Sequence, residues 1–304
     1  MQQRSSRQGI ALLITLMFVI VISIAIGYNL QQVKDASKIV QKEKQLYQNT
    51  MFLSDILHLL QSSKQLEKIS DNNESSGALF AFLSTSKYIP LQVANMKVEL
   101  YITSAREKLN INELERDNEA YFREFFAHMM LGNNYTDVLK DCMSKFHGKN
   151  DYNNYSSVIF NENPYLFREY IASRKHLDII NEFYKNEYND EHINDVDFSK
   201  IFAFSADTNE KVDLNYAKPE LLMLLLNTTK ERADALFALP KPFTSVKDMQ
   251  LKENEKVVLS KFKTSFFEPY LHIEAVISNE YEYSKMSFDY DMRLKKGSNF
   301  VFEI

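Results

Sequence analysis

The chain has 304 residues, of which 45% are hydrophobic, and its formal net charge is −5 at pH 7 with a pI near 5.8. This length allows one large core, or two smaller cores beside a membrane helix. The acidic balance argues against a general nucleic-acid-binding protein, which needs a basic face. The single cysteine, Cys142, excludes an internal disulfide and a cysteine-cluster metal site.

The N-terminus combines a short basic segment with a long apolar one. The first nine residues contain two arginines and no acidic residue, and they end at Gly9. Residues 10–30 are almost wholly apolar, and as a helix rising about 1.5 Å per residue they would span roughly 30 Å, enough to cross a bilayer. The basic segment would hold the N-terminus in the cytoplasm, so the rest of the chain is expected to be exported.

Three interpretations of this segment share that topology. A prepilin-type leader would be cut between Gly9 and Ile10, which leaves the apolar helix on the mature protein. An uncleaved signal anchor has the same hydropathy. A conventional secretory signal could instead be cut near the small residues 25–27, after the apolar segment.

The exported part begins with a helical pattern. Apolar residues recur at three- and four-residue steps over 31–68, which predicts an amphipathic helix, and residues 71–77 are expected to form a loop. Alternation over 93–103 predicts a strand with one buried face. The same period returns at 271–277 and 286–294, and residues 300–304 supply a final short strand.

The sheet is therefore expected to be assembled from both ends of the exported region around an insertion of helices without strands. A helix is predicted to open at Asn163–Pro164 and to run over 165–184, and capping boxes are expected at Thr228 and Ser245. The order of elements indicates an α+β fold. The other predicted helices of the insertion are 119–131, 136–146, 220–226 and 231–239.

The sequence offers no assembled catalytic group. The six histidines are scattered, and Cys142 and His147 are too far apart on a helix to share a face, so Cys142 is interpreted as a buried hydrophobic side chain. The acidic residues of 189–197 could surround a cation but lack the EF-hand order, and we interpret them as a solvated loop. Residues 219–239 outline a helix-hairpin-helix without the glycines that let backbone amides approach phosphate, so a packing role is preferred.

Several segments resemble general secretion pathway protein K, the large minor pseudopilin of type II secretion systems. RQGIALLIT at the N-terminus is similar to the start of that family. LNINEL from Leu109 and KVDLNYAKPELL from Lys211 are similar to two of its internal motifs, and FTSVKDM from Phe243 to a third. The matching positions are Leu109, Asn110, Asn112, Asp213, Asn215, Ala217, Pro219 and Glu220, with Asp213 where the family often has Asn and Asn227 in place of a Pro-Gly turn.

The resemblance implies a long N-terminal transmembrane and amphipathic helix packed on an antiparallel sheet, with a large all-helical, SAM-like insertion. The expected divisions are a leader at 1–9, a transmembrane helix at 10–30, a pseudopilin α/β domain at 31–111 and 268–304, and a helical insertion at 112–267. Calcium is possible by resemblance, but no ligands are assignable, and the cofactor is left unknown.

Ile14 connects the resemblance to the way neighbouring subunits pair inside the membrane. Most pilins and pseudopilins carry glutamate at this position, thought to pair with the N-terminal amine of a neighbouring subunit. Inserting an ionisable side chain into a bilayer costs about 2.5–3.5 kcal/mol on insertion scales. Such a residue is therefore retained only where another group pairs with it. Because a subunit at the tip has no neighbour beyond it, Ile14 is typical of a tip subunit.

The predicted function is therefore a non-enzymatic minor pseudopilin that caps the type II secretion pseudopilus and supports its assembly and protein export. Its expected partners are other minor pseudopilins, the prepilin peptidase and the inner-membrane secretion platform. Cleavage by the peptidase would expose an amine at Ile10 that is open to methylation. No direct nucleic acid contact is expected. The expected location is the bacterial inner membrane, single-pass, with the bulk of the chain periplasmic. The alternatives are a minor component of a competence or type IV pilus machine for DNA uptake, and a membrane-tethered hydrolase.

Overall fold

The computed structural model describes residues 31–303 apart from 33, 35–36, 38, 41, 72–75, 94–95, 115–116, 144–155 and 279–282. The predicted leader, the Gly9–Ile10 junction, the apolar segment and Ile14 lie outside the described residues. Within the described part of the chain, no helix combines the length and the apolar character needed to cross a membrane. The described residues form two units with separate hydrophobic cores, a sheet unit and a helical unit.

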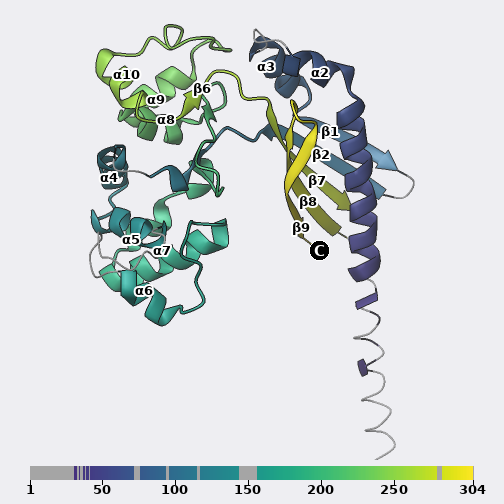
Figure 1. The fold of residues 1–304 in the computed structure, drawn as a ribbon, viewed down its shortest axis with the longest axis horizontal. Coiled ribbons are helices and arrows are strands. Elements are labelled where there is room, and N and C mark those ends of the chain that lie inside the picture. Colours follow the sequence, from purple (N-terminus) through teal and green to yellow (C-terminus); the bar gives the residue numbers. More distant parts are fainter. Residues whose placement is uncertain are drawn as a thin grey trace, which may run out of the picture.

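The sheet unit contains a five-stranded sheet whose neighbouring strands are all antiparallel (Figure 1). Its spatial order is β1-β2-β7-β8-β9, so strands from both ends of the exported region meet between β2 and β7. This agrees with the α+β class and with the expected assembly of the sheet around an insertion. The strands are β1 (Tyr88–Val93), β2 (Met96–Ser104), β7 (Tyr270–Ser278), β8 (Tyr283–Asp291) and β9 (Lys296–Glu303).

Alternating burial explains why these segments are strands. Val98, Leu100 and Ile102 on β2 are buried while their neighbours are not, and β7 and β8 alternate in the same way. The prediction is wrong at the end of β8, because Leu294 is 67% exposed and lies in a turn. Asp291 ends the strand, since its carboxylate accepts the backbone N–H groups of Arg293 and Leu294.

Helices cover one face of the sheet. The N-terminal helix, which includes residues 39–40 and 42–62, breaks at Ser63 and is followed by α2 (Lys64–Asp71), so the single helix predicted to about residue 68 is interrupted. The predicted loop at 71–77 is wrong at both ends, because Asp71 ends α2 and α3 (Ser76–Thr85) begins within it. The helices contribute Ile56, Leu66, Ile69, Leu79 and Leu83 to the core.

The helical unit lies between β2 and β7 in the sequence and has an aromatic core. Phe122 packs on Phe202 with ring centroids 6.1 Å apart, and Phe126 meets Tyr135 edge to face at 4.8 Å. Its helices are α4 (Glu119–His128), α5 (Asn134–Met143), α6 (Ser156–Glu162), α7 (Arg174–Tyr188), α8 (Pro219–Leu226), α9 (Lys230–Phe237) and α10 (Glu253–Leu259), with 3-10 turns at Ile111–Glu113, Glu191–Asp195 and Phe198–Lys200.

The expectation of an all-helical insertion is wrong. Two short parallel pairs lie within this unit: β3 (Leu109–Asn110) with β4 (Phe202–Ala203), and β5 (Val212–Asp213) with β6 (Thr264–Ser265). Strands of two residues are too short to produce an alternating pattern, which is why periodicity did not indicate them.

Two predicted helix starts are also wrong. Pro164 follows the end of α6 instead of opening a helix, and α7 starts ten residues later, where the Ser173 hydroxyl accepts the backbone N–H of His176. Thr229, one residue beyond the predicted Thr228, caps α9.

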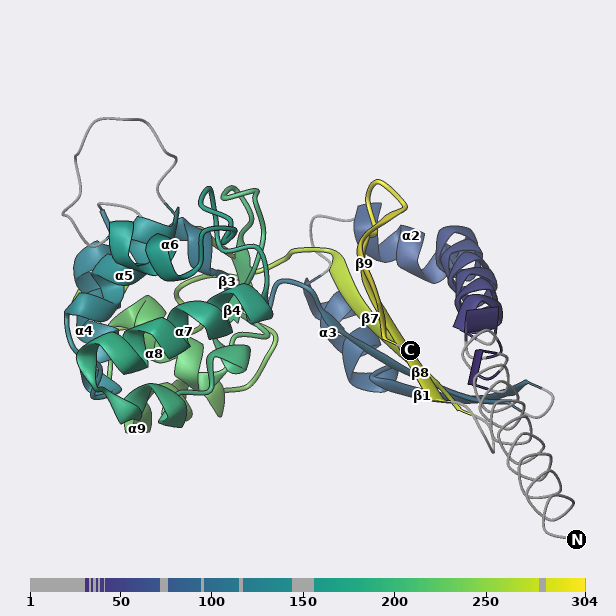
Figure 2. The same cartoon turned by 90° about the horizontal axis from the view of Figure 1, so that it is seen from below.

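The two units lie side by side, joined by two chain segments (Figure 2). Both views place the helical unit on the side of the sheet away from the N-terminal helix. The core of the helical unit draws on residues from Leu109 to Phe262. Residues 105–108 lead into it and residues 266–269 lead back to β7.

Candidate functional site

Asn110 and Asn112 tie the start of the helical unit to two later segments. The Asn112 amide donates to the carbonyl oxygens of Ile171 and Ser205 at 3.1 and 3.0 Å, and its oxygen accepts the Ile171 N–H at 2.8 Å. Asn110 donates to the carbonyls of Ser205 and Asp207, both at 3.0 Å. The two side chains therefore satisfy backbone groups of loops that have no regular partners.

Asn215 forms a second network of the same kind. Its Nδ2 donates to the carbonyl oxygens of Phe243 and Phe266 at 3.0 and 2.9 Å, and its Oδ1 accepts the Phe243 N–H at 2.6 Å. The side chain is buried. It therefore holds the loop before α8 to the loop after α9 and to the segment that returns to the sheet.

Asp213 lies beside this network and joins it to the linkers. Its two carboxylate oxygens each accept a backbone N–H, from Asn215 and from Glu268, at 3.0 Å, and its own N–H donates to the Arg106 carbonyl at 2.8 Å. Burial raises the pKa of Asp213 to about 6, although both N–H donors favour the charged form.

The remaining motif positions also serve the fold. Leu109 and Ala217 are fully buried, Pro219 is the first residue of α8, and Glu220 lies 3.4 Å from Lys200 Nζ. The structure thus brings Asp213 and Asn215 together, and Asn110 with Asn112, as parts of the framework. These residues form no catalytic cluster.

Arg106, in the first linker, contacts both the helical unit and the first residue of β7, and no motif in the sequence marked it. Its guanidinium lies 2.7 Å from a Glu210 carboxylate oxygen and 4.2 Å from the centre of the Tyr270 ring. The ion pair is mostly buried, with 17% of each side chain exposed. The neighbouring Ala105 N–H donates to the Tyr270 carbonyl at 2.9 Å. The ion pair and the cation–π contact of this one side chain therefore join the first linker to both units.

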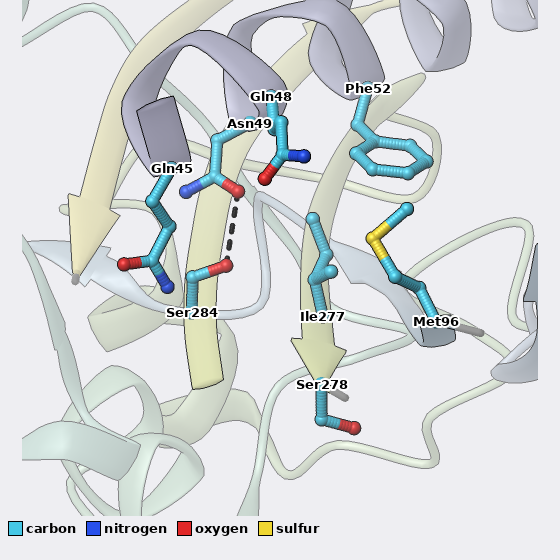
Figure 3. A pocket seen from close by; sticks show the side chains of 8 residues that line it. All are labelled: Gln45, Gln48, Asn49, Phe52, Met96, Ile277, Ser278 and Ser284. Atoms are coloured by element: carbon cyan, nitrogen blue, oxygen red, sulfur yellow. Dashed lines mark hydrogen bonds between the residues drawn. The ribbon is translucent and has the colours of Figure 1, made fainter. Parts of the chain in front are cut away.

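The N-terminal helix is fastened to the sheet by polar side chains as well as apolar ones (Figure 3). Asn49 is 2% exposed and its oxygen accepts the Ser284 hydroxyl at 3.0 Å; Gln45 donates to the Tyr283 carbonyl at 3.0 Å. The cavity there has about 10 Å³, room for one water. It is lined by Gln45, Gln48, Asn49, Phe52, Met96, Ile277, Ser278 and Ser284.

The opposite face of this helix presents an apolar stripe to solvent, formed by Val40, Tyr47 and Met51. Their exposed fractions are 64, 68 and 53%. Spacings of seven and four residues place them on one helical face, and Ile39 and Leu46 flank it, with exposed fractions of 59 and 45%. An apolar stripe of this kind on a helix that already covers a sheet is typical of a protein–protein contact.

The candidate catalytic and metal-binding residues are engaged in other contacts. Cys142 is fully buried, and burial raises the pKa of its thiol to about 12; His147 lies outside the described residues. In the acidic loop, Asp190 accepts the Tyr184 hydroxyl at 2.7 Å and Glu191 pairs with Lys185 at 3.0 Å. Across the described ranges, no group of three or more His, Cys, Asp or Glu residues could hold a metal ion.

The helix-hairpin-helix formed by α8 and α9 uses its turn amides internally. Asn227 adopts the left-handed conformation with φ 44°, the position that glycine often fills. The N–H groups of Asn227 and Thr228 donate to the carbonyls of Leu224 and Met223. Because those two amides are already used, they are not free to bind a phosphate.

Comparison with known proteins finds matches among solved structures. No protein-family profile and no curated protein matches the chain. Among solved structures, the chain is similar to a chain of the GspK-GspI-GspJ complex from the enterotoxigenic Escherichia coli type 2 secretion system, with a TM-score of 0.57 and 10% identity. The match covers 87% of this chain and 99% of that chain. The chain has a GspK-like fold. The resemblance expected from the sequence motifs is thereby confirmed for the fold.

Proposed function

We propose that this protein is a minor pseudopilin that occupies the tip of a type II secretion pseudopilus and supports its assembly. The observation that carries the proposal is the GspK-like fold over nearly the whole length of the matched chain, including the helical unit inserted between β2 and β7. The matched protein was crystallised with GspI and GspJ. We propose that this chain likewise assembles with other minor pseudopilins.

The position at the tip is supported by the shape of the chain and by its sequence. The helical unit projects sideways from the sheet, where it would obstruct the close stacking of repeated subunits (Figures 1 and 2). Ile14 replaces the glutamate of shaft subunits, so a subunit beyond this one would find no carboxylate to pair with its N-terminal amine.

The proposal includes the membrane anchor. A prepilin peptidase would cut between Gly9 and Ile10, and residues 10–30 would stay in the inner membrane with the body in the periplasm. The exposed stripe of Val40, Tyr47 and Met51 would continue the contact surface of that helix outside the bilayer.

The test compares two full-length variants expressed in the native host. Tyr47→Ser combined with Met51→Ser removes two of the three side chains of the stripe, whereas Leu59→Ser changes an apolar residue that is also exposed, 66%, on another face of the same helix. We expect the first variant to lose co-purification with other minor pseudopilins and to reduce protein export, and the Leu59 variant to behave as wild type. Equal co-purification of both variants would refute the assembly role of this face.

If deletion of the gene abolished DNA uptake and left protein export intact, a pilus machine would be the better assignment.

A further inference from the structure

A cleft of about 590 Å³ lies where the sheet unit meets the helical unit. The sheet unit contributes α3 and the end of β2, and the helical unit contributes the loop before α8 and the end of α9. Both views show α3 as the helix of the sheet unit closest to the helical unit (Figures 1 and 2). The volume falls in the range of ligand-binding clefts.

The walls of the cleft are largely apolar and are held in place by contacts between the units. The rings of Phe80 on α3 and Tyr216 on the opposite wall stack with centroids 6.1 Å apart and an interplanar angle of 28°. Tyr216 also packs against the core of the sheet unit. The apolar lining is completed by Leu83, Ile102, Phe237 and Leu239.

Positive charge is concentrated in this cleft, although the whole chain is acidic. Three lysines and one glutamate line it, and that glutamate, Glu107, lies 3.6 Å from Lys218 Nζ. Lys87 and Lys241 have no carboxylate within ion-pair distance among the described residues. Lys241 Nζ instead lies 4.1 Å from the centre of the Phe237 ring, and burial lowers its pKa to about 8. The charge of Asp213 favours the ammonium form of Lys241, but Asp213 is not within ion-pair distance, so this half-buried ammonium can pair directly with a carboxylate of a ligand.

Tyr216 supplies a second unmet polar group. Its hydroxyl is buried and has no hydrogen-bond partner among the described residues. Buried hydroxyls are normally paired, so this one is a polar group at the junction that the described contacts leave unsatisfied.

We propose that this cleft binds an extended peptide segment of a partner protein, in which one acidic residue is flanked by aliphatic or aromatic residues. The acidic side chain pairs with Lys241 and Lys87, and the flanking side chains pack against Phe80, Tyr216 and Phe237. A peptide is preferred to a fatty acid because Ser84 and Thr103 also line the cleft and offer partners to backbone amides. This inference concerns the junction and does not depend on the pseudopilin assignment.

The test measures binding of the full-length protein in detergent to an array of nonapeptides. Each has a central Glu with varied apolar residues on both sides, and each has a counterpart with Gln at the centre. We expect Glu peptides to bind about tenfold more tightly than their Gln counterparts, the effect of one partly desolvated ion pair. Lys241→Met keeps the length and apolar stem of the side chain and is expected to abolish that preference, whereas Lys230→Met, an exposed lysine at the far end of α9, should keep it.

A second pair of variants tests occupancy of the cleft. Ser84→Trp places a large ring in the cleft from an exposed position on α3, and Ser62→Trp makes the same change at an exposed position away from the cleft. Loss of peptide binding in the first variant only supports the proposal. The proposal fails if no Glu peptide binds, if Gln peptides bind equally well, or if sodium laurate binds with the Lys241 dependence and the peptides do not.

Discussion

Asn215 offers the sharpest test of the framework that joins the two units. Replacing it by alanine removes three hydrogen bonds and leaves the Phe243 N–H and the carbonyls of Phe243 and Phe266 buried without partners. Each such group costs about 1–3 kcal/mol, so we expect Asn215→Ala to lower the unfolding free energy by at least about 3 kcal/mol. Asn209→Ala, at an exposed position in the same unit, should cost under about 0.5 kcal/mol.

The Asn215→Asp variant separates the effect of hydrogen bonding from that of packing, because aspartate has nearly the same shape as asparagine. The introduced carboxyl keeps the acceptor for the Phe243 N–H but sets its second oxygen about 3 Å from two carbonyl oxygens. Its pKa in the folded state is therefore raised above the unfolded value of about 3.9, and the penalty is absent below that pH and grows as pH rises. Asn209→Asp serves as the matched control, with little pH dependence expected.

The assay is equilibrium unfolding in urea, followed by circular dichroism on the full-length protein in detergent at pH 4 and pH 7. At pH 7 we expect the Asn209 variants to be the most stable, and Asn215→Ala and Asn215→Asp to be less stable. If Asn215→Ala unfolds within about 1 kcal/mol of its Asn209 control, the side chain does not hold these loops and the reasoning is refuted.

Three further predictions concern the junction and the N-terminus. The pKa of Asp213 is raised to about 6 from 3.8, so the free energy of unfolding falls as pH rises between these values, by at most about 1.4 kcal/mol per pH unit. Asp213→Asn should flatten this pH dependence of the free energy of unfolding in urea. A variant with the same pH dependence as the wild type would contradict the prediction. Arg106→Ala should destabilise the protein by about 1–3 kcal/mol and speed chymotrypsin cleavage of the linkers; cleavage at the wild-type rate would count against the junction's rigidity. Gly9→Val should block leader removal, so migration identical to the processed wild type on a denaturing gel would oppose the prepilin interpretation.

The sequence predicted the strands that bury one face along their length. β7 alternates buried and half-buried positions over nine residues and β8 over its last eight, so the period located β7 and the greater part of β8. The edge strand β1 escaped prediction because it contains Pro90 and exposes Tyr88 and Leu91, which leaves no clean alternation. The helix start at Asn163 failed because proline after asparagine is as compatible with the end of one helix as with the start of another.

The site was predictable only in part, since its contacts join residues far apart in sequence. Motif resemblance picked out Asn110 and Asn215, yet Asn110 reaches partners 95 and 97 residues away, which no local pattern encodes. Arg106 carried no motif signal, and its role emerged only when Glu210 and Tyr270 were placed around it. The cleft at the junction was likewise invisible, because Lys241 and Phe80 come from different units.

The identity of the mature N-terminus tests the central claim most directly. Intact-mass measurement of the protein purified from the membrane of its native host should give a chain that begins at Ile10, with or without one methyl group on its amine. The apolar helix would then remain on the mature subunit as the element by which other pseudopilins hold it. A mature chain that begins after Gly27, released from the membrane, would contradict the account.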